Sequence, residues 1–297
     1  MSGNIAIPGR RTGFSLGGYL TSGRWTTPVI VVLMTIAGVA MLYPFLWMVF
    51  GSFKTMPDII RIPPELLPRP WTLEAFQEVF GHRVNIWRGY LNSFFVTGIV
   101  IVTVLFTSSL GCYVFTRLNF PGRRVVFYFV LSTTMVPAMT LMIPRYLIWY
   151  KVELLNTYWP ILLGALFNAF GIFLWCQFIL GIPVDLYESA KLDGAGDFGI
   201  YRRIILPLCK PIAAIQIIGL FLGTFNDFLT PLLYLNDEAK FTLPLLLRVV
   251  ASRFAGQGSY NVVMAGSLLT TLPVLIVFMI FRRYIIQCIA LTGLSGN

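Results

Sequence analysis

Charged residues are scarce in this chain of 297 residues. Lys, Arg, Asp and Glu together make up 11% of it, whereas hydrophobic residues make up 57%. Soluble globular domains carry about 25% charged residues, so this composition excludes an ordinary soluble domain. A mean hydropathy of +0.78 agrees with that exclusion. The composition therefore predicts an integral membrane protein.

Histidine and paired cysteines are also nearly absent. His82 is the only histidine, which excludes zinc motifs built on two histidines. Cys112, Cys176, Cys209 and Cys288 stand singly in or beside apolar runs, without metal or redox spacing, and we interpret them as small buried hydrophobic residues. The chain has no GxxxxGK[ST] phosphate-binding motif and no nucleophile arrangement typical of a membrane-embedded enzyme. We therefore expect no catalytic, metal or cofactor-binding residue.

Positive charge exceeds negative charge, with a formal net charge of +10. In a soluble domain this excess would suggest a nucleic-acid partner. In a membrane protein, Lys and Arg held on the cytoplasmic side and at lipid headgroups explain it more simply. We therefore expect membrane lipid, and no nucleic acid, around the basic residues.

Six apolar runs are each long enough to cross a bilayer, which takes about 20 helical residues. The first follows a polar segment, residues 1–27, and is too long for the apolar part of a signal peptide, so we expect it to be retained. The proline-rich stretch 51–89 is typical of an irregular external loop. Residues 90–286 would form a core of five further spans, followed by a cytoplasmic tail, 287–297. The predicted spans are residues 28–50, 90–115, 125–143, 158–180, 211–235 and 262–281.

Basic residues near the ends of short loops predict the orientation, because they favour the cytoplasmic side. The turn 117–124 has three basic residues in eight, whereas the loop 144–157 has two in fourteen. Six spans place both termini on one side of the membrane. We therefore expect both termini, and the polar loop 181–210, in the cytoplasm.

The loop 181–210 contains the longest polar interruption in the second half of the chain, Glu188–Pro207. Pro183 suits the first turn of a helix, where its missing N–H would be unpaired in any case. The residues Val184–Leu192 predict one short helix, and Phe198–Ile205 predict a second helix that stops before the following proline. The glycines between them predict a sharp turn.

The apolar side chains of this loop need a surface that covers them. Leu186, Tyr187, Ala190 and Leu192 lie at helix-like intervals among charged residues. A protein partner would cover them, or they would lie at the lipid interface as one face of an amphipathic helix. The residue pattern leaves both interpretations open.

The spacing in this loop resembles the EAA loop of binding-protein-dependent ABC importer permeases. Its departure from the pattern is Ser189, where alanine is usual, and a serine is small enough to keep the packing. Asn92–Ser93, Pro137, Pro144 and Phe225–Leu232 resemble the carbohydrate-uptake branch, of the maltose-permease G-like type, as does the C-terminal tail. The likeness covers nearly the whole chain. The loop positions that it singles out are Glu188, Ser189, Ala190, Asp193, Gly194, Ile204, Leu206 and Pro207.

The resemblance implies an all-α, polytopic protein with six transmembrane helices, the type I ABC importer permease fold, in the inner or plasma membrane of a bacterial cell. It implies four kinds of partner: a second permease subunit, two cytoplasmic ATPase subunits that bind the ATP, an external solute-binding protein, and a carbohydrate substrate. In this family each EAA loop sits in a cleft on one ATPase. Glu188 would be the polar contact there, while Ala190 and Gly194 would permit close approach.

Asp227 is the one acidic residue inside a predicted span. A carboxylate within the membrane is a candidate functional group. Together with Asn226 it could line the translocation path or gate and bind sugar hydroxyls, or it could stabilise a helix interface, and both interpretations stay open. One turn earlier, Gly219 and Gly223 form a GxxxG pair, which indicates a close helix contact.

The main alternative function is that of an ion-gradient-driven secondary transporter or channel. Such transporters place several ionisable groups within their spans, whereas the predicted spans here hold one acidic residue. They also have no need of a long cytoplasmic loop with EAA spacing. We therefore expect a permease subunit of an ABC importer for a sugar or related carbohydrate, which forms half of the translocation pathway.

Overall fold

The computed structural model describes residues 26–81, 85–254 and 258–294. Within these ranges every regular element is helical and no strand occurs, which confirms the all-α expectation there. His82, most of the predicted N-terminal segment 1–27 and the end of the predicted tail lie outside the described residues.

Among the described residues, four helical segments are long and apolar enough to cross a membrane. They coincide with the first, second, fourth and sixth predicted spans. They are α2 (Thr26–Gly51), α5 (Ile86–Arg117), Trp159–Leu180 with α8 (Trp159–Ala165) and α9 (Ala169–Leu180), and the first part of α16 (Tyr260–Leu294). A fifth arises if Asp197–Leu208 and Lys210–Phe225, which are bent by 74° against each other, count as one span.

The third predicted span, residues 125–143, is wrong as a continuous helix. The chain instead forms α6 (Arg123–Ser132) and one turn of 3-10 helix, η1 (Thr133–Met135). After an irregular stretch, α7 (Met142–Lys151) follows. Val136 is extended, with φ −80° and ψ 118°. A residue before proline is disfavoured in the α region, so Pro137 ends the helix here.

The fifth predicted span, residues 211–235, is also interrupted. One helix, α13 (Lys210–Phe225), ends before α14 (Leu229–Tyr234) begins. Pro231 explains the gap, because in a continuous helix its ring would clash with the carbonyl of Asp227, four residues earlier. Asp227 therefore lies in a break between two helices.

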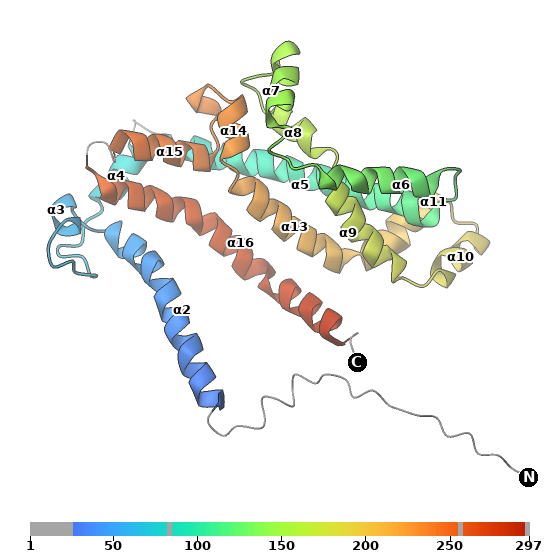
Figure 1. The fold of residues 1–297 in the computed structure, drawn as a ribbon, viewed down its shortest axis with the longest axis horizontal. Helices are drawn as coiled ribbons and strands as arrows, with labels where there is room; N and C mark the ends of the chain where they lie inside the picture. The colour runs from blue at the N-terminus through green and yellow to red at the C-terminus, as the bar shows by residue number, and fades with distance from the viewer. Residues whose placement is uncertain (1–25, 82–84, 255–257, 295–297) are drawn as a thin grey trace, which may run out of the picture.

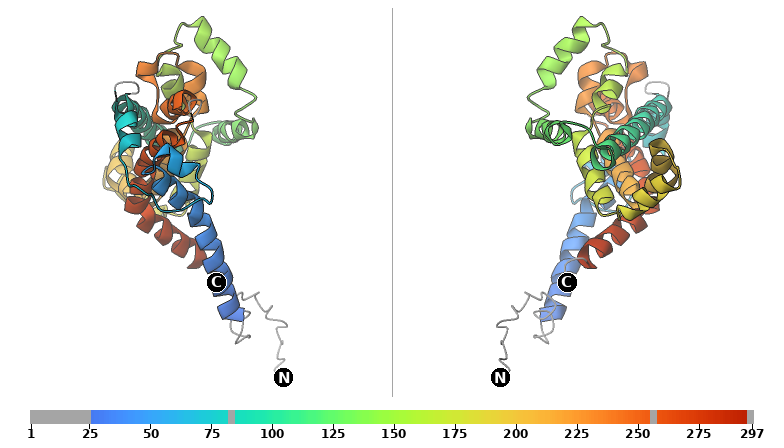
Figure 2. Two further views of the ribbon diagram at one scale, coloured as in Figure 1. Left: turned by 90° about the vertical axis from the view of Figure 1, so that its left-hand side faces the viewer. Right: turned by 90° about the vertical axis from the view of Figure 1, so that its right-hand side faces the viewer.

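The long helix α5 is the centre of the packing. It contacts α9 and α13, and α13 in turn contacts α16; Figure 1 shows these helices side by side. An additional helix, α15 (Leu243–Phe254), lies between the fifth and sixth predicted spans and packs on α5 and α16. Figure 2 shows that α2 leans away from this body. Its apolar side chains are exposed, as at Met41, which is 73% exposed, so lipid or another subunit must cover α2.

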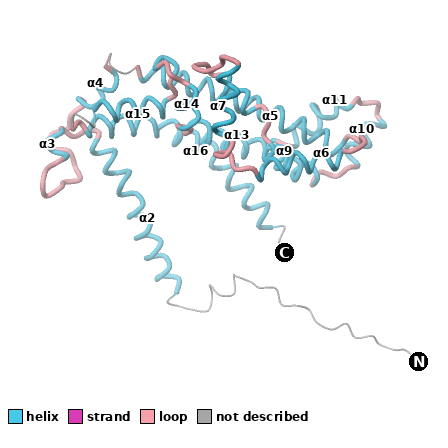
Figure 3. The backbone as a smooth tube through the Cα atoms, turned by 45° about the horizontal axis from the view of Figure 1, so that its top comes forward, coloured by secondary structure: helices cyan, strands magenta, loops and turns pink. Residues whose placement is uncertain are grey.

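The two ends of α5 carry different structures, as Figure 3 shows. The short helices α3 (Met56–Ile59) and α4 (Glu74–Phe80) of the predicted external loop lie near one end, and the loop 181–210 lies near the other. A helix as long as α5 spans the thickness of a bilayer. The two loops therefore face opposite sides of any membrane that α5 crosses.

The predicted external loop 51–89 is organised around a buried lysine. Lys54 is 1% exposed, and its ammonium lies 4.0 Å from the carboxylate of Asp58 and donates to the carbonyl of Glu65. The backbone N–H of Arg69 donates to the same carboxylate at 3.2 Å. These bonds hold an otherwise irregular, proline-rich stretch in one arrangement.

The close helix contact expected at Gly219 and Gly223 does not occur within the part of the chain that the structure describes. Both glycines are exposed, and a Cβ atom at either would meet nothing within 4 Å. The close approach occurs at Gly171 of α9, where a Cβ would overlap Gln216 of α13 and Ser108 of α5. A GxxxG pattern marks a smooth helix face but does not say whether that face meets its own chain.

Candidate functional site

The loop 181–210, hereafter the coupling loop, contains two short helical pieces joined by a turn. The first is α10 (Asp185–Leu192), capped at Val184, so Pro183 precedes the helix and does not lie in its first turn as predicted. Gly194 has φ +80°, a left-handed conformation that favours glycine, and it closes the end of α10. A Cβ at Gly194 would meet nothing within 4 Å, so backbone geometry explains this glycine.

The second helical piece is longer than predicted. It comprises α11 (Asp197–Ile200), one π-helical turn η2 (Tyr201–Ile205) and α12 (Leu206–Leu208), and so runs through Pro207. In the π turn the N–H of Leu206 bonds the carbonyl of Tyr201. The next residue is the proline, whose missing N–H falls in the first turn of α12, where no helical partner is needed.

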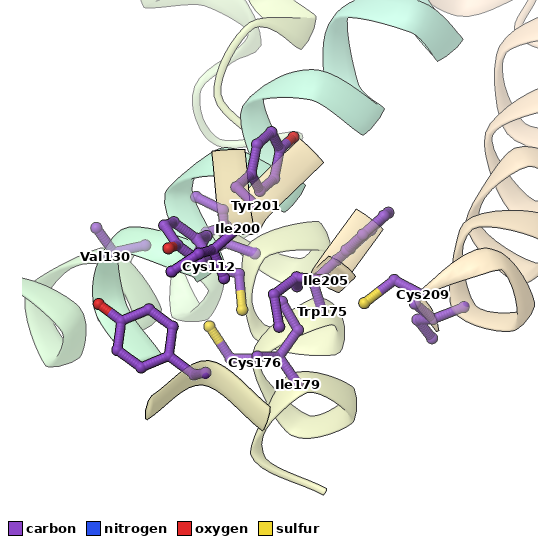
Figure 4. Close-up of a cluster of buried hydrophobic side chains, with 14 of the residues drawn as sticks. Cys112, Val130, Trp175, Cys176, Ile179, Ile200, Tyr201, Ile205 and Cys209 are labelled. Carbon is purple, nitrogen blue, oxygen red and sulfur yellow. The ribbon is translucent and has the colours of Figure 1, made fainter. Parts of the chain in front are cut away.

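The inner face of the coupling loop is bonded to α5. The Tyr187 hydroxyl donates to the Asp197 carboxylate at 2.8 Å, and Tyr113 of α5 donates to the Asp197 backbone carbonyl at 2.9 Å. The hydroxyls of Ser109 and Tyr201 are hydrogen-bonded at 2.8 Å. These polar contacts surround a buried apolar cluster that joins the loop to α5 and α9, shown in Figure 4.

Three buried cysteines belong to this cluster. Cys112 comes from α5, Cys176 from α9 and Cys209 from the end of the coupling loop, and all three are free thiols. Figure 4 shows the sulfur atoms of Cys112 and Cys176 turned toward each other. The interpretation as small buried hydrophobic residues is confirmed for these three, and the side chain of Cys288 lies outside the described part of the chain.

Arg117, the last residue of α5, binds the backbone at the start of the coupling loop. Its guanidinium donates to the carbonyls of Ile179 and Ile182 at 3.0 and 2.9 Å. Ile179 lies in the last turn of α9, and Ile182 follows the end of this helix. One side chain therefore ties the end of one long helix to the end of another at the point where the loop starts.

The predicted loop residues divide between the two faces. Glu188, Ser189, Asp193, Gly194, Leu206 and Pro207 are exposed, Ile204 is partly buried, and Ala190 is 8% exposed. Ala190 packs in the chain's own cluster, and its small size lets α10 lie against the rest of the fold. Its role in close approach of an ATPase stays a prediction.

The apolar residues of the loop divide in the same way. Tyr187 is buried with Ala190, whereas Leu186 is 45% exposed and Leu192 is 89% exposed. Lys191 lies 3.5 Å from the Asp197 carboxylate. Hydrogen bonding with Tyr187 and the charge of Asp197 raise the pKa of Lys191. The outer face thus combines charged groups with uncovered leucines.

Asn226 and Asp227 lie together in the break before α14, but their side chains do different things. The exposed Asn226 amide donates to the carbonyl of Leu222 at 3.0 Å, within its own helix. The Asp227 carboxylate accepts from the N–H of Thr230 at 3.1 Å and lines a cavity of about 420 Å³. The structure therefore associates Asp227, and not Asn226, with a cavity.

Arg145 is the residue that the sequence interpretation missed at this cavity. The sequence predicts that Arg145 lies in the loop 144–157, outside the third span. In the structure it lies on α7 and lines the cavity with Asp227. The signal that could have found it is the pair Pro137 and Pro144, because two prolines so close together rarely belong to one straight helix.

The chain matches a known family over residues 107–290, described as binding-protein-dependent transport system inner membrane component. It is 32% identical over 279 residues to the arabinooligosaccharides transport system permease protein AraQ of Halalkalibacterium halodurans, covering 92% of this chain and 99% of that protein. It is 30% identical to the diacetylchitobiose uptake system permease protein NgcG of Streptomyces coelicolor, covering 89% and 88%.

A solved structure is similar as well. It is a bacterial ABC transporter involved in the import of the acidic polysaccharide alginate, with a TM-score of 0.81 and 26% sequence identity, covering 92% of this chain and 99% of the solved chain. The fold is thus that of type I ABC importer permeases. The chain is a multi-pass membrane protein that belongs to the binding-protein-dependent transport system inner membrane component family, the permeases of ABC importers.

Proposed function

We propose that this chain is one of two permease subunits of an ATP-driven carbohydrate importer in the inner membrane of a bacterium. The proposal rests on the exposed apolar side chains on the outer face of the coupling loop. Leu192 and Phe198 are 89% and 64% exposed there, beside the exposed carboxylate of Glu188. Large uncovered apolar side chains on an ordered, polar surface are typical of protein interfaces. A cytoplasmic ATPase that binds and hydrolyses ATP would cover this face.

The inner face of the loop supports a mechanism for coupling. Asp197 is bonded both to Tyr187 and to Tyr113 of α5, so hydrogen bonds join the helix that carries the outer face to α5. A change in the ATPase that displaces Leu192 would therefore displace α5, and with it α9, through Arg117. Nucleotide state would bias inward-facing against outward-facing arrangements by this route.

The topology that we propose has six crossings with both termini in the cytoplasm. Besides the four long spans and the bent fifth, the remaining crossing would be made by the broken segment α6–α7. Exposed basic residues support this orientation, since Arg124, Arg202 and Arg203 lie at the coupling-loop end of α5. Lys and Arg favour the cytoplasmic side of a membrane.

A carbohydrate is the substrate that the relatives support. Two of them have names that refer to arabinooligosaccharides and diacetylchitobiose, and the solved relative is involved in the import of alginate. An external solute-binding protein would deliver the sugar to the two permeases. We propose no ATP site within this chain, because the sequence has no phosphate-binding motif.

The experiment that tests this function separates ATP from ion gradients. The chain would be reconstituted in proteoliposomes with its second permease, its ATPases and its binding protein, and uptake of labelled oligosaccharides would be measured. We expect uptake that requires ATP on the ATPase side and persists when proton and sodium ionophores dissipate both gradients. Uptake without ATP that the ionophores abolish would contradict the proposal and favour a secondary transporter.

A further inference from the structure

Two adjoining cavities meet at one group of side chains from different elements. The larger has a volume of about 420 Å³ and the smaller about 240 Å³. Both are lined by Arg145 of α7, Asp227 of the helix break, and Thr230 and Tyr234 of α14. Trp149, one turn after Arg145, lines the larger cavity. That volume falls within the range of about 300–1,000 Å³ found for small-molecule sites.

The two charges in these cavities are not paired with each other. Among the described residues no ion pair joins Arg145 to Asp227 or to another carboxylate. One oxygen of Asp227 accepts from the N–H of Thr230, which leaves the other oxygen available. Arg145 is exposed in this chain, whereas Asp227 is partly buried. An ionisable group of a predicted span, such as Asp227, is costly and marks a substrate pathway when it faces a cavity.

The break at Asp227 explains how these groups come together. Pro137 ends the helix before α7, and Pro231 forces the gap between α13 and α14. In two unbroken helices neither Arg145 nor Asp227 would lie at a helix end beside an open space. The same interruptions that make the predicted spans wrong therefore produce the cavities.

The chemistry of the group fits a sugar ring. A guanidinium presents several N–H donors in a plane, and a carboxylate only accepts, so neighbouring hydroxyls that both donate and accept can satisfy both groups. Tyr234 is 5% exposed and lines the larger cavity together with Arg145, Asp227 and Trp149. Mostly apolar walls with a few polar groups are the usual composition of such a site.

The opposite signs of the two charges favour an uncharged sugar. An acidic sugar that bound Arg145 would place its carboxylate in the same cavity as Asp227, where like charges repel. We propose that Arg145 and Asp227, with Trp149 and Tyr234 beside them, bind one ring of a neutral oligosaccharide on its way through this subunit. This inference rests on the proposed function, because it requires that a carbohydrate pass between the helices.

The test uses the complete importer in proteoliposomes with a panel of labelled probes: arabinotriose, maltotriose, diacetylchitobiose and the acidic trigalacturonate. We expect uptake of at least one neutral probe. Arg145→Gln and Asp227→Asn should each raise the ATP hydrolysed per sugar imported about tenfold, since each removes a hydrogen bond between a charged group and the sugar. The control is Arg248→Gln, because Arg248 lies over the ring of Phe228 and outside both cavities, and it should change this ratio little.

The double variant Arg145→Gln/Asp227→Asn separates a sugar site from a structural pair. If the two charges only balance each other, removing both should restore import to near the wild-type ratio, and that result would overturn the inference. A sugar site predicts a double variant no better than the worse single variant. Single variants that import as wild type does, or a wild type that imports only trigalacturonate, would also overturn it. A wild type that imports none of the probes, or that needs no ATP, would contradict the proposed function itself.

Discussion

The hydroxyl of Tyr187 donates a hydrogen bond to the carboxylate of Asp197 at 2.8 Å, across the turn of the coupling loop. The backbone carbonyl of the same Asp197 accepts from Tyr113 of α5 at 2.9 Å. One residue thus links the first helical piece of the loop to the second and the second to a membrane helix. These hydrogen bonds join the coupling loop to α5.

Replacing Tyr187 by phenylalanine should weaken the loop without unpacking it. Tyr187→Phe keeps the ring that packs in the cluster and removes the hydroxyl, so we expect a loss of about 1 kcal/mol in the free energy of unfolding. Thermal unfolding of the purified subunit in detergent measures this loss. Tyr128→Phe is the matched control, because Tyr128 is 66% exposed on α6. An equal loss in both variants would show that the bond to Asp197 contributes nothing.

Adding a methyl group at Gly171 should disturb the contact of three helices. A Cβ there would overlap Gln216, which accepts a hydrogen bond from Trp175, and Ser108. Overpacking of this kind costs about 1–3 kcal/mol, so Gly171→Ala should unfold at a lower temperature than wild type. Gly98→Ala is the control, since a Cβ at Gly98 of α5 meets nothing within 4 Å. If Gly171→Ala is as stable as the control, the helices are not packed as described.

Removing the apolar side chain of Leu192 should impair assembly but not folding. Leu192 is 89% exposed, so Leu192→Ser should leave the stability of the isolated subunit nearly unchanged. If an ATPase covers this leucine, losing its burial costs about 1.5–3 kcal/mol, which weakens ATPase binding by about tenfold or more. Co-purification and titration with the ATPase measure the effect. The control Ile62→Ser, at a residue 91% exposed on the predicted external loop, should bind the ATPase as wild type does.

Breaking the buried ion pair in the stretch 51–89 should destabilise the protein strongly. Lys54→Met leaves the carboxylate of Asp58, which is 4% exposed, without its cation, and an unpaired buried charge costs about 3–5 kcal/mol. The double variant Lys54→Met/Asp58→Leu removes both charges and should regain a large part of that loss. Thermal unfolding of the three proteins measures the difference. A single variant as stable as wild type would show that the pair is not buried in the protein in solution.

Local features of the fold could be predicted from the sequence. The apolar runs of α2, α5 and α16 identify spans because a helix in a membrane needs only length and hydropathy. The two helical pieces of the coupling loop are visible because Gly194 and its neighbours interrupt an otherwise helical pattern. These signals are contained in consecutive residues, so no knowledge of the packing was required.

Features that depend on contacts between distant residues could not be predicted. The pattern identified Ala190, but only the packing shows that it faces this chain's own core. Gly219 and Gly223 have the spacing of a close contact, yet within the described residues nothing approaches them. Arg145 and Asp227 line the same cavity although they are far apart in the sequence and lie beside different helix breaks. The partner contacts of the coupling loop stay predictions, because they involve atoms of other proteins.

The central proposal is that an ATPase binds the outer face of the coupling loop. The most direct measurement compares wild type, Glu188→Ala and the control Glu78→Ala, exposed on α4, for ATPase binding and for ATP-dependent sugar uptake. We expect Glu188→Ala to weaken ATPase binding by about tenfold or more, since a hydrogen bond to a charged group contributes about 1.5–3 kcal/mol, and to lower uptake accordingly. Glu78→Ala should match wild type in both. Equal ATPase binding and equal uptake by Glu188→Ala and wild type would contradict the account.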